Sequence, residues 1–423
     1  MQTEKDLREE FVRRTQLNFE RLSGDTYAGV FREPTYDWPG DWEGRYLLAG
    51  VMLRRLTGKA PAPMQRLLQH LDEHTNEQGY FGAVTDGKFA DEQQLSGNGW
   101  FLRGLCEYYA DSPSDEIRER IGKIVRELYL KSADLYARYP IFGARAHGGV
   151  SGSAVGETDG WKLSSDVGCA FIALDGLSAA YVLFPSEELK QFIDGCMRFF
   201  LEMDLLRLHL QTHATLTCCR AVLRMYEKTG NQQYLTWAKK IFSLYTAHGM
   251  TLTYENFNWF GREDSWTEPC AVIDSLIVSL GLYKATGEED YVVLARRIWL
   301  NAFRLCQRDN GGAGTNSCVT RENGVWRSQM YEAYFCCSMR TAEGLYWAGQ
   351  SLDLLLGHAQ EDVASEPAQD EYGRWFCGDR LLCSQGGGPL IPLPSAADYS
   401  ETELQSLRLR ILFAPGEKPG QKS

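Results

Sequence analysis

Residues 229–234 (TGNQQY) begin a stretch that recurs 57 residues later as residues 286–291 (TGEEDY). The apolar segments 238–242 (AKKIF) and 295–299 (ARRIW) follow the two copies at the same offset. Glycine directly after an apolar-periodic run is the common left-handed cap of a helix, and the tyrosine with the apolar stripe starts the next helix. The repeat therefore spans one helix pair, which is typical of an array of helical hairpins.

Apolar residues recur with a helical period over most of the chain, and strand-like alternation is scarce before residue 370. The periodic runs lie at residues 5–22, 42–57, 62–74, 97–110, 114–136, 167–183, 187–203, 212–229, 231–247, 268–285, 288–306 and 337–356. About twelve helices in six pairs predict an all-α fold, an (α/α)6 toroid over residues 1–357 in which inner and outer helices alternate.

The pattern changes after residue 357. Residues 358–371 are polar and acidic, which predicts a linker, and residues 407–413 alternate like a single strand. We therefore expect a small β-containing segment at residues 372–414, followed by a disordered tail at residues 415–423.

Charge and composition exclude several classes of partner. The net charge of −12 and the pI near 5.2 argue against binding to nucleic acid or to an anionic membrane. No apolar run reaches the roughly 18 residues of a membrane span, and the charged residues 1–14 do not resemble a signal peptide. Twelve cysteines without an export signal predict reduced thiols and a cytoplasmic location.

The longest connections all lead into the expected inner helices, so they gather on one face of the toroid. These connections are residues 23–41, 75–96, 137–166, 249–267 and 307–336. Long loops on a rigid scaffold are where binding residues collect. The candidate substrate-binding residues on this face are Trp42, Gln93, Asn98, Asp166, His213, Trp259 and Tyr334. Each could instead be a packing or capping residue, and Asp41 and Asp166 are plausible N-caps.

Two cysteine-containing clusters, Glu268-Pro-Cys270 and Cys336-Cys337, lie where apolar helical runs begin. Three thiolates and one carboxylate form a complete tetrahedral donor set for zinc. The sequence therefore predicts a Zn²⁺ site at Glu268, Cys270, Cys336 and Cys337. The alternative is that these thiols fill the core, as we expect for Cys106, Cys169, Cys196, Cys218, Cys219 and Cys306.

Glu255 is a second carboxylate in the long loop before Glu268. Its aromatic neighbours Tyr254, Phe257 and Trp259 provide an environment that would raise its pKa, as a general acid requires. Glu263 is nearer to Glu268 in the sequence and could take the same role. A solvated loop carboxylate without catalytic function is the alternative.

Four elements together resemble the β-L-arabinofuranosidase family of glycoside hydrolases (family 127 and its relatives). In order, they are Glu255-Asn-Phe, Glu268-Pro-Cys270, the helical segment from Tyr291 to Asn301 and the Cys336-Cys337 doublet. The resemblance is strongest over residues 210–345 and weaker over residues 37–200. The sugar-pocket motifs differ, since QQLS stands at residues 93–96 where the family has His-Glu-Leu-Tyr. The chain is also too short for the sizeable β-sandwich of most relatives.

The resemblance implies a retaining hydrolase that releases L-arabinofuranose from short β-L-arabinofuranosides or related glycosides. It implies that Glu268, Cys270, Cys336 and Cys337 bind Zn²⁺ and that Cys336 is the nucleophile. It also implies that Glu255 is the acid/base. A small carbohydrate is then the partner, and a homodimer is possible.

Two other functions fit the same sequence. The first is a metal-independent toroid enzyme, an unsaturated-uronyl hydrolase or a sugar 2-epimerase, for which Asp41, Asp166 and His213 could serve. The second is a non-catalytic carbohydrate-binding protein in which zinc is purely structural.

Overall fold

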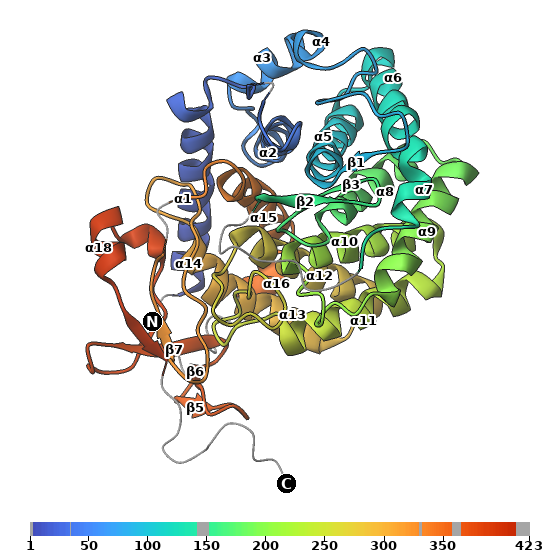
Figure 1. Cartoon of the computed structure of the whole chain (residues 1–423). Coiled ribbons are helices and arrows are strands. Elements are labelled where there is room, and N and C mark those ends of the chain that lie inside the picture. Colours follow the sequence, from blue (N-terminus) through green and yellow to red (C-terminus); the bar gives the residue numbers. More distant parts are fainter. Residues whose placement is uncertain (1–2, 34, 142–151, 330–331, 358–364, 412–423) are drawn as a thin grey trace. The chain divides into compact units, whose positions relative to one another are not determined.

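The chain folds into paired helices with a small sheet near its C-terminus (Figure 1). The computed structural model describes residues 3–33, 35–141, 152–329, 332–357 and 365–411. The helices are α1 (Glu4–Ser23), α2 (Asp41–Thr57), α3 (Pro63–Gln69), α4 (Leu71–His74), α5 (Glu92–Asp111), α6 (Asp115–Ile124), α7 (Ala133–Tyr136), α8 (Ala173–Leu183), α9 (Glu187–Glu202), α10 (Thr212–Thr229), α11 (Gln232–His248), α12 (Pro269–Thr286), α13 (Glu289–Arg297), α14 (Arg304–Cys306), α15 (Cys337–Gln350), α16 (Leu352–Leu356) and α18 (Glu401–Ser406).

The twelve predicted periodic runs all coincide with helices or with successive short helices. Two of the long runs contain a π-helical turn, η2 (Val125–Tyr129) and η5 (Ile298–Phe303). A short 3-10 turn, η4 (Cys169–Ile172), precedes α8. The structure starts α5 several residues earlier than the predicted run, because the side chain of Asp91 caps it by accepting the backbone N–H groups of Gln93 and Gln94.

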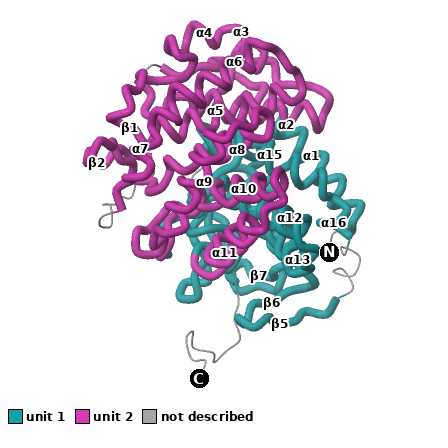
Figure 2. The backbone as a smooth tube through the Cα atoms, turned by 90° about the vertical axis from the view of Figure 1, so that its right-hand side faces the viewer, with its two compact units in different colours: residues 1–21, 249–258, 262–423 teal, residues 22–248, 259–261 magenta. Residues whose placement is uncertain are grey.

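Figure 2 divides the chain into two compact units. Unit 2 comprises residues 22–248 and 259–261. Within it the largely buried helices α2, α5, α8 and α10 pack one against the next, and α3, α6, α9 and α11 each pack on the outer side of one of them. Inner and outer helices alternate along the chain, as predicted.

Unit 1 comprises residues 1–21, 249–258 and 262–423. Its buried helices α12 and α15 pack against each other, and α13 packs on α12. Helix α12 is 18 residues long and apolar enough to span a membrane by composition, which corrects the prediction that no run is this long. Because 72% of that window is buried in the protein, α12 has the surroundings of a core helix.

A Thr-Gly pair forms the same C-terminal cap on three helices, α2, α10 and α12. Gly58, Gly230 and Gly287 are all left-handed, with φ of 75°, 68° and 71°. In each case the preceding threonine donates its hydroxyl to the carbonyl four residues earlier and accepts the N–H two residues later. The left-handed caps predicted at Gly230 and Gly287 are therefore confirmed, and Gly58 has the same arrangement.

A six-stranded sheet belongs to unit 1. Its strands are β4 (Val325–Trp326), β5 (Ala368–Gln369), β6 (Trp375–Cys377), β7 (Arg380–Gln385), β8 (Ile391–Pro392) and β9 (Leu409–Ile411). The order is β4-β9-β7-β6-β5 with β8 beside β7, and every pairing is antiparallel. The predicted strand at 407–413 corresponds to β9, and its last two residues lie outside the described residues. The boundaries 357 and 372–414 stay predictions, as does the tail at 415–423, which the structure does not describe.

A second, three-stranded sheet in unit 2 was not predicted. It consists of β1 (Ala90–Asp91), β2 (Ala154–Thr158) and β3 (Trp161–Ser164), with β3 in the middle. The hairpin β2–β3 lies inside the long connection 137–166. Its strands are short and β2 is exposed throughout, so they carry little apolar alternation.

Candidate metal centre

The two cysteine clusters begin two neighbouring helices of unit 1. Pro269 is the first residue of α12, a position where its missing N–H costs no helical hydrogen bond, and Cys270 is the second. Cys336 is the N-cap of α15 and Cys337 its first residue. Because α12 packs against α15, both helix N-termini bring thiols to one place, and the positive end of each helix dipole favours thiolate there.

The four predicted ligands meet in space. One donor atom from each of Glu268, Cys270, Cys336 and Cys337 lies within 4.8 Å of the others. The Sγ atoms of Cys270 and Cys337 are 3.5 Å apart, and those of Cys336 and Cys337 are 3.3 Å apart. A disulfide bond measures about 2.05 Å, so these sulfurs are neighbours and not bonded partners.

This donor set fits a tetrahedral metal ion. Sulfurs held at about 2.3 Å from zinc are separated by roughly 3.8 Å, close to the distances found here. Burial and the neighbouring thiols raise the pKa of Cys337 well above its usual range in the protein alone. A divalent cation would supply the positive charge that buried thiolates need. The cluster could therefore bind a metal such as zinc.

The three thiols differ in exposure. Cys270 and Cys337 are fully buried, whereas Cys336 is partly exposed. Tyr334 and Phe335, immediately before Cys336, are 41% and 40% exposed and contact each other edge to face. Cys336 is therefore the thiol of the cluster that a molecule in solution can reach, beside two exposed aromatic rings.

A network of hydrogen bonds holds the Cys336-Cys337 turn. The hydroxyl of Ser338 donates to Glu332 at 2.7 Å and accepts the N–H of Ala313 at 2.9 Å. Glu332 in turn forms a salt bridge with Arg21 of α1 at 2.8 Å, and Asn18 of α1 donates to the carbonyl of Ser338. The turn that carries two ligands is thus anchored to α1.

Glu255 lies beside the centre, in the core of unit 1. Its side chain is fully buried, so the alternative of a solvated loop carboxylate is wrong. It accepts hydrogen bonds from Asn316 at 2.6 Å, from Thr253 at 3.0 Å and from Thr267, which precedes Glu268, at 3.4 Å. Burial raises the pKa of Glu255 to about 7, the direction expected from the sequence. Glu263, in contrast, is exposed.

Asn316 and Arg308 join this network, and the sequence analysis missed both. Asn316 accepts from Arg308 at 2.9 Å, donates to Glu255, and donates its N–H to Thr267 at 3.0 Å. Both residues lie in the irregular connection 307–336, where no periodicity marks a buried position.

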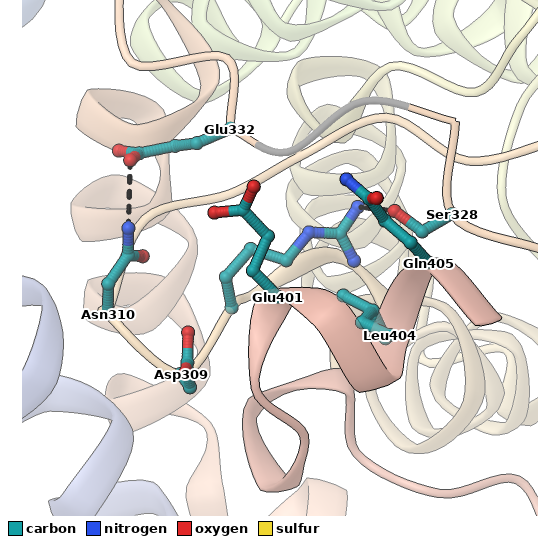
Figure 3. Close-up of a pocket in the computed structure, with 8 residues that line it drawn as sticks. Asp309, Asn310, Ser328, Glu332, Glu401, Leu404 and Gln405 are labelled. Atoms are coloured by element: carbon teal, nitrogen blue, oxygen red, sulfur yellow. Dashed lines mark hydrogen bonds between the residues drawn. The ribbon is translucent and has the colours of Figure 1, made fainter. Parts of the chain in front are cut away.

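Arg308 and Glu332 also line a polar pocket of about 90 Å³ (Figure 3). Asn310 donates to Glu332 there at 2.9 Å. The remaining lining residues are Asp309, Ser328, Glu401, Leu404 and Gln405. None of the four clustered ligands is among the residues that line this pocket.

The other predicted substrate-binding residues, apart from Tyr334, belong to unit 2, where each packs or bonds locally. Trp42 stacks on Tyr27 and His213 stacks on Trp100. Trp259 is buried and pairs with Gln211 through its backbone. These roles in substrate binding stay predictions.

The polar residues among them bond chiefly to backbone. Asn98 lies in the second turn of α5, inside the helix, and bonds to both backbone groups of Phe81. Gln93 donates to the carbonyl of Gly152.

Two predicted N-caps are wrong. Gly40 is the N-cap of α2, while Asp41 follows it and pairs with Arg45 at 2.8 Å. Asp166 lies two residues before Gly168, the N-cap of η4. Glycine takes both cap positions because each needs a left-handed backbone, with φ of 85° and 86°.

No protein-family model matches the sequence, and no curated protein matches it. Solved structures do match. A sugar epimerase from a ruminal bacterium is 12% identical over 82% of this chain and 98% of its own, with a TM-score of 0.55. An unsaturated glucuronyl hydrolase specific for heparin is 12% identical with the same coverages and a TM-score of 0.53. A protein described as a glycoside hydrolase is 13% identical over 79% of this chain, with a TM-score of 0.52.

These likenesses show the fold. The predicted fold class, an (α/α)6 toroid of about twelve helices with a small C-terminal antiparallel sheet, is confirmed. The chain spans 58% of the length of the glycoside hydrolase that it matches. Because this fold hosts both hydrolases and epimerases, the reaction has to be argued from the site.

Proposed function

We propose that this protein is a retaining glycoside hydrolase in which Cys336, held in a zinc cluster, is the nucleophile. The observation that carries the proposal is the meeting of Glu268, Cys270, Cys336 and Cys337 within 4.8 Å, with only Cys336 reachable from solution among the three thiols. A structural thiol site would have no need to expose one sulfur beside two exposed aromatic rings.

Cys336 would begin the reaction by attacking the anomeric carbon of the sugar. Its Sγ forms a bond to that carbon while the bond to the leaving oxygen breaks, and a carboxylic acid gives this oxygen its proton. Bound zinc would keep the cysteine sulfurs deprotonated near neutral pH, where an ordinary thiol with a pKa of about 8.5 is mostly protonated.

Water completes the reaction from the face that the leaving oxygen occupied, opposite to the carbon–sulfur bond. The carboxylate formed in the first step takes a proton from water, and the resulting oxygen attacks the anomeric carbon. The carbon–sulfur bond breaks and Cys336 leaves as a thiolate. Two displacements at one carbon retain its configuration.

We assign the acid/base role to Glu255 ahead of Glu263. A pKa of about 7 suits a group that must both give and take a proton near neutral pH, and Glu255 is linked to the cluster through Thr267. Glu263 is exposed and lies outside this network of hydrogen bonds among the described contacts. The variants Glu255→Gln and Glu263→Gln decide between the two: we expect Glu255→Gln to lose activity and Glu263→Gln to keep it.

A short β-L-arabinofuranoside or a related glycoside is the substrate we propose. The sugar class rests on the sequence resemblance and agrees with the sugar-directed activities named for the matching structures. A cytoplasmic protein with reduced thiols, acting on small carbohydrates, is the setting we propose.

One experiment tests the proposal most directly. Nitrophenyl glycosides, with the β-L-arabinofuranoside included, are screened on a sample whose zinc content is measured by elemental analysis. We expect about one zinc per chain and release of nitrophenol from one class of glycoside. A protein that contains zinc and cleaves none of them contradicts the proposed hydrolase.

A metal-independent sugar epimerase is the second candidate. The chain covers 98% of the matching epimerase and 98% of the matching unsaturated glucuronyl hydrolase, so its length fits either of these metal-independent enzymes. The same metal measurement separates the two: interconversion of sugar epimers by zinc-free protein, purified without chelator, supports the epimerase. A third outcome, zinc with no sensitivity to thiol alkylation, supports a binding protein with structural zinc.

A further inference from the structure

We propose that Arg374, from the C-terminal sheet region, is a positioning residue that clamps Tyr254 and so fixes the carboxylate of Glu255. The inference rests on the proposed function for the role of Glu255, and on the contacts of unit 1 for the clamp itself.

Tyr254 has an unusual backbone for a bulky residue. Its φ is 65°, in the left-handed region that favours glycine. It closes a tight turn, since the N–H of Tyr254 donates to Thr251 at 3.1 Å and the N–H of Thr251 donates to the carbonyl of Glu255 at 2.9 Å. Thr253 in the same turn donates to the Glu255 carboxylate. The turn thus sets where this carboxylate lies.

Surrounding contacts must hold such a conformation, because the backbone alone disfavours it. The hydroxyl oxygen of Tyr254 accepts from Arg374 at 3.2 Å and from Arg297 at 3.3 Å. Arg374 also donates to the carbonyl of Leu252 at 2.7 Å, and its guanidinium lies 4.9 Å from the centre of the Tyr254 ring. The side chain of Arg374 therefore hydrogen-bonds both to the phenol of Tyr254 and to the backbone of the turn.

Both arginines are themselves fixed. Asp370 pairs with Arg374 at 2.7 Å, and Asp379 pairs with Arg297 at 3.0 Å. Asp379 is the last residue of the turn between β6 and β7, and this turn is tied to the π-helical segment η5. There Asn301 donates to the carbonyl of Asp379 and accepts the N–H of Leu381. The π-turn thus presents an asparagine that docks the hairpin β6–β7.

The contacts form one chain of supports from the sheet to the proposed acid/base. The hairpin docks on η5 and orders Arg374, Arg374 holds Tyr254, and the turn of Tyr254 aims Glu255 at Asn316 and Thr267. The small C-terminal sheet would therefore help to position the carboxylate of Glu255, in addition to covering part of the core.

Arg374→Met and Tyr254→Phe test the clamp, and Arg410→Met in β9 is the matched control because Arg410 is an exposed arginine of the same sheet. Hydrogen–deuterium exchange of residues 249–258 is measured with kinetics on the best nitrophenyl glycoside. We expect Arg374→Met to speed amide exchange in this segment about tenfold and to lower kcat about 10- to 100-fold with less than a twofold change in KM. Arg374→Lys should recover part of both effects, and Arg410→Met should match the wild type.

The two readouts separate the clamp from the proposed function. If the wild type cleaves no glycoside, the exchange data still decide whether Arg374 holds the turn. If the wild type is active, exchange and kcat that stay unchanged in Arg374→Met and in Tyr254→Phe overturn the clamp and leave the hydrolase intact. Faster exchange across the whole of unit 1, and not only at 249–258, also overturns it because it indicates general destabilisation.

Discussion

Cys336 differs from the other thiols of the cluster because it is partly exposed, and under the proposed function this difference predicts the effect of its replacement. Cys336→Ser should abolish glycoside hydrolysis, lowering kcat about 10³-fold or more, because a serine hydroxyl stays protonated where the thiol is ionised. The circular dichroism spectrum should stay close to that of the wild type, since Cys336 is only partly buried, and the unfolding temperature should fall no further than that of the metal-free wild type. Cys383→Ser in β7, outside the cluster, is the control and should keep its activity. Substantial glycosidase activity in Cys336→Ser would exclude a cysteine nucleophile.

Glu255 predicts a pH dependence of stability whose sign follows from its burial. Its pKa is raised from an ordinary value of 4.5 to about 7, mainly because burial disfavours the charged form. Its contribution to folding is therefore fully present below about pH 4.5 and is lost as the pH rises through 7. Between pH 5 and pH 8, the free energy of unfolding of the wild type should fall relative to that of Glu255→Gln, by up to about 3 kcal/mol. Urea titrations of both proteins at the two pH values measure this difference, and parallel pH curves would contradict it.

At the level of single residues, the sequence predicted the clustered donors better than their surroundings. Cysteine pairs with a nearby glutamate stand out by residue type, and the structure brings all four together. Asn316 and Arg308 could not be predicted, because a buried polar network in an irregular loop depends on tertiary contacts and leaves no local pattern.

At the scale of helices, a glycine that caps a helix and a glycine inside a helix should respond in opposite ways to replacement by alanine. Gly287→Ala should destabilise the protein by about 1 kcal/mol, because its left-handed φ of 71° disfavours a side chain although the space around it is open. Gly195→Ala, on the exposed side of α9 with equal space and an ordinary helical backbone, should stabilise it by roughly 0.4–1 kcal/mol. Chemical denaturation of both variants measures the difference. Equal effects would show that the backbone at residue 287 is not the constraint.

The period of the apolar residues predicted where the helices lie, but it did not predict the irregular elements. The π-turns η2 and η5 lie inside continuous periodic runs, because one additional residue in a turn hardly disturbs the apolar pattern. The early start of α5 depends on the cap by Asp91, which precedes the apolar residues. The hairpin β2–β3 was missed because its first strand is exposed on both faces.

For the whole molecule, the recurrence of helix pairs was sufficient to predict the toroid, because each pair buries its apolar face only against its neighbours. The matching structures share this fold at 12–13% identity, so the apolar pattern and the caps specify it with few fixed residues. The pattern says nothing about chemistry, since the same scaffold is found in hydrolases and in an epimerase.

Removal of the metal is the test that involves the whole of unit 1. The proposed zinc would join the start of α12 to the start of α15, so it binds the folded chain only and stabilises it by mass action, about 4 kcal/mol when free zinc exceeds its Kd a thousandfold. We expect dialysis against a chelator to lower the unfolding temperature by several degrees and added zinc to restore it. Cys337→Ser, which removes a buried ligand, should unfold at the same temperature with or without chelator. A zinc-containing wild type whose unfolding temperature and activity both survive loss of the metal would show that the cluster binds zinc without using it, and the thiolate of Cys336 would then need another source of its charge.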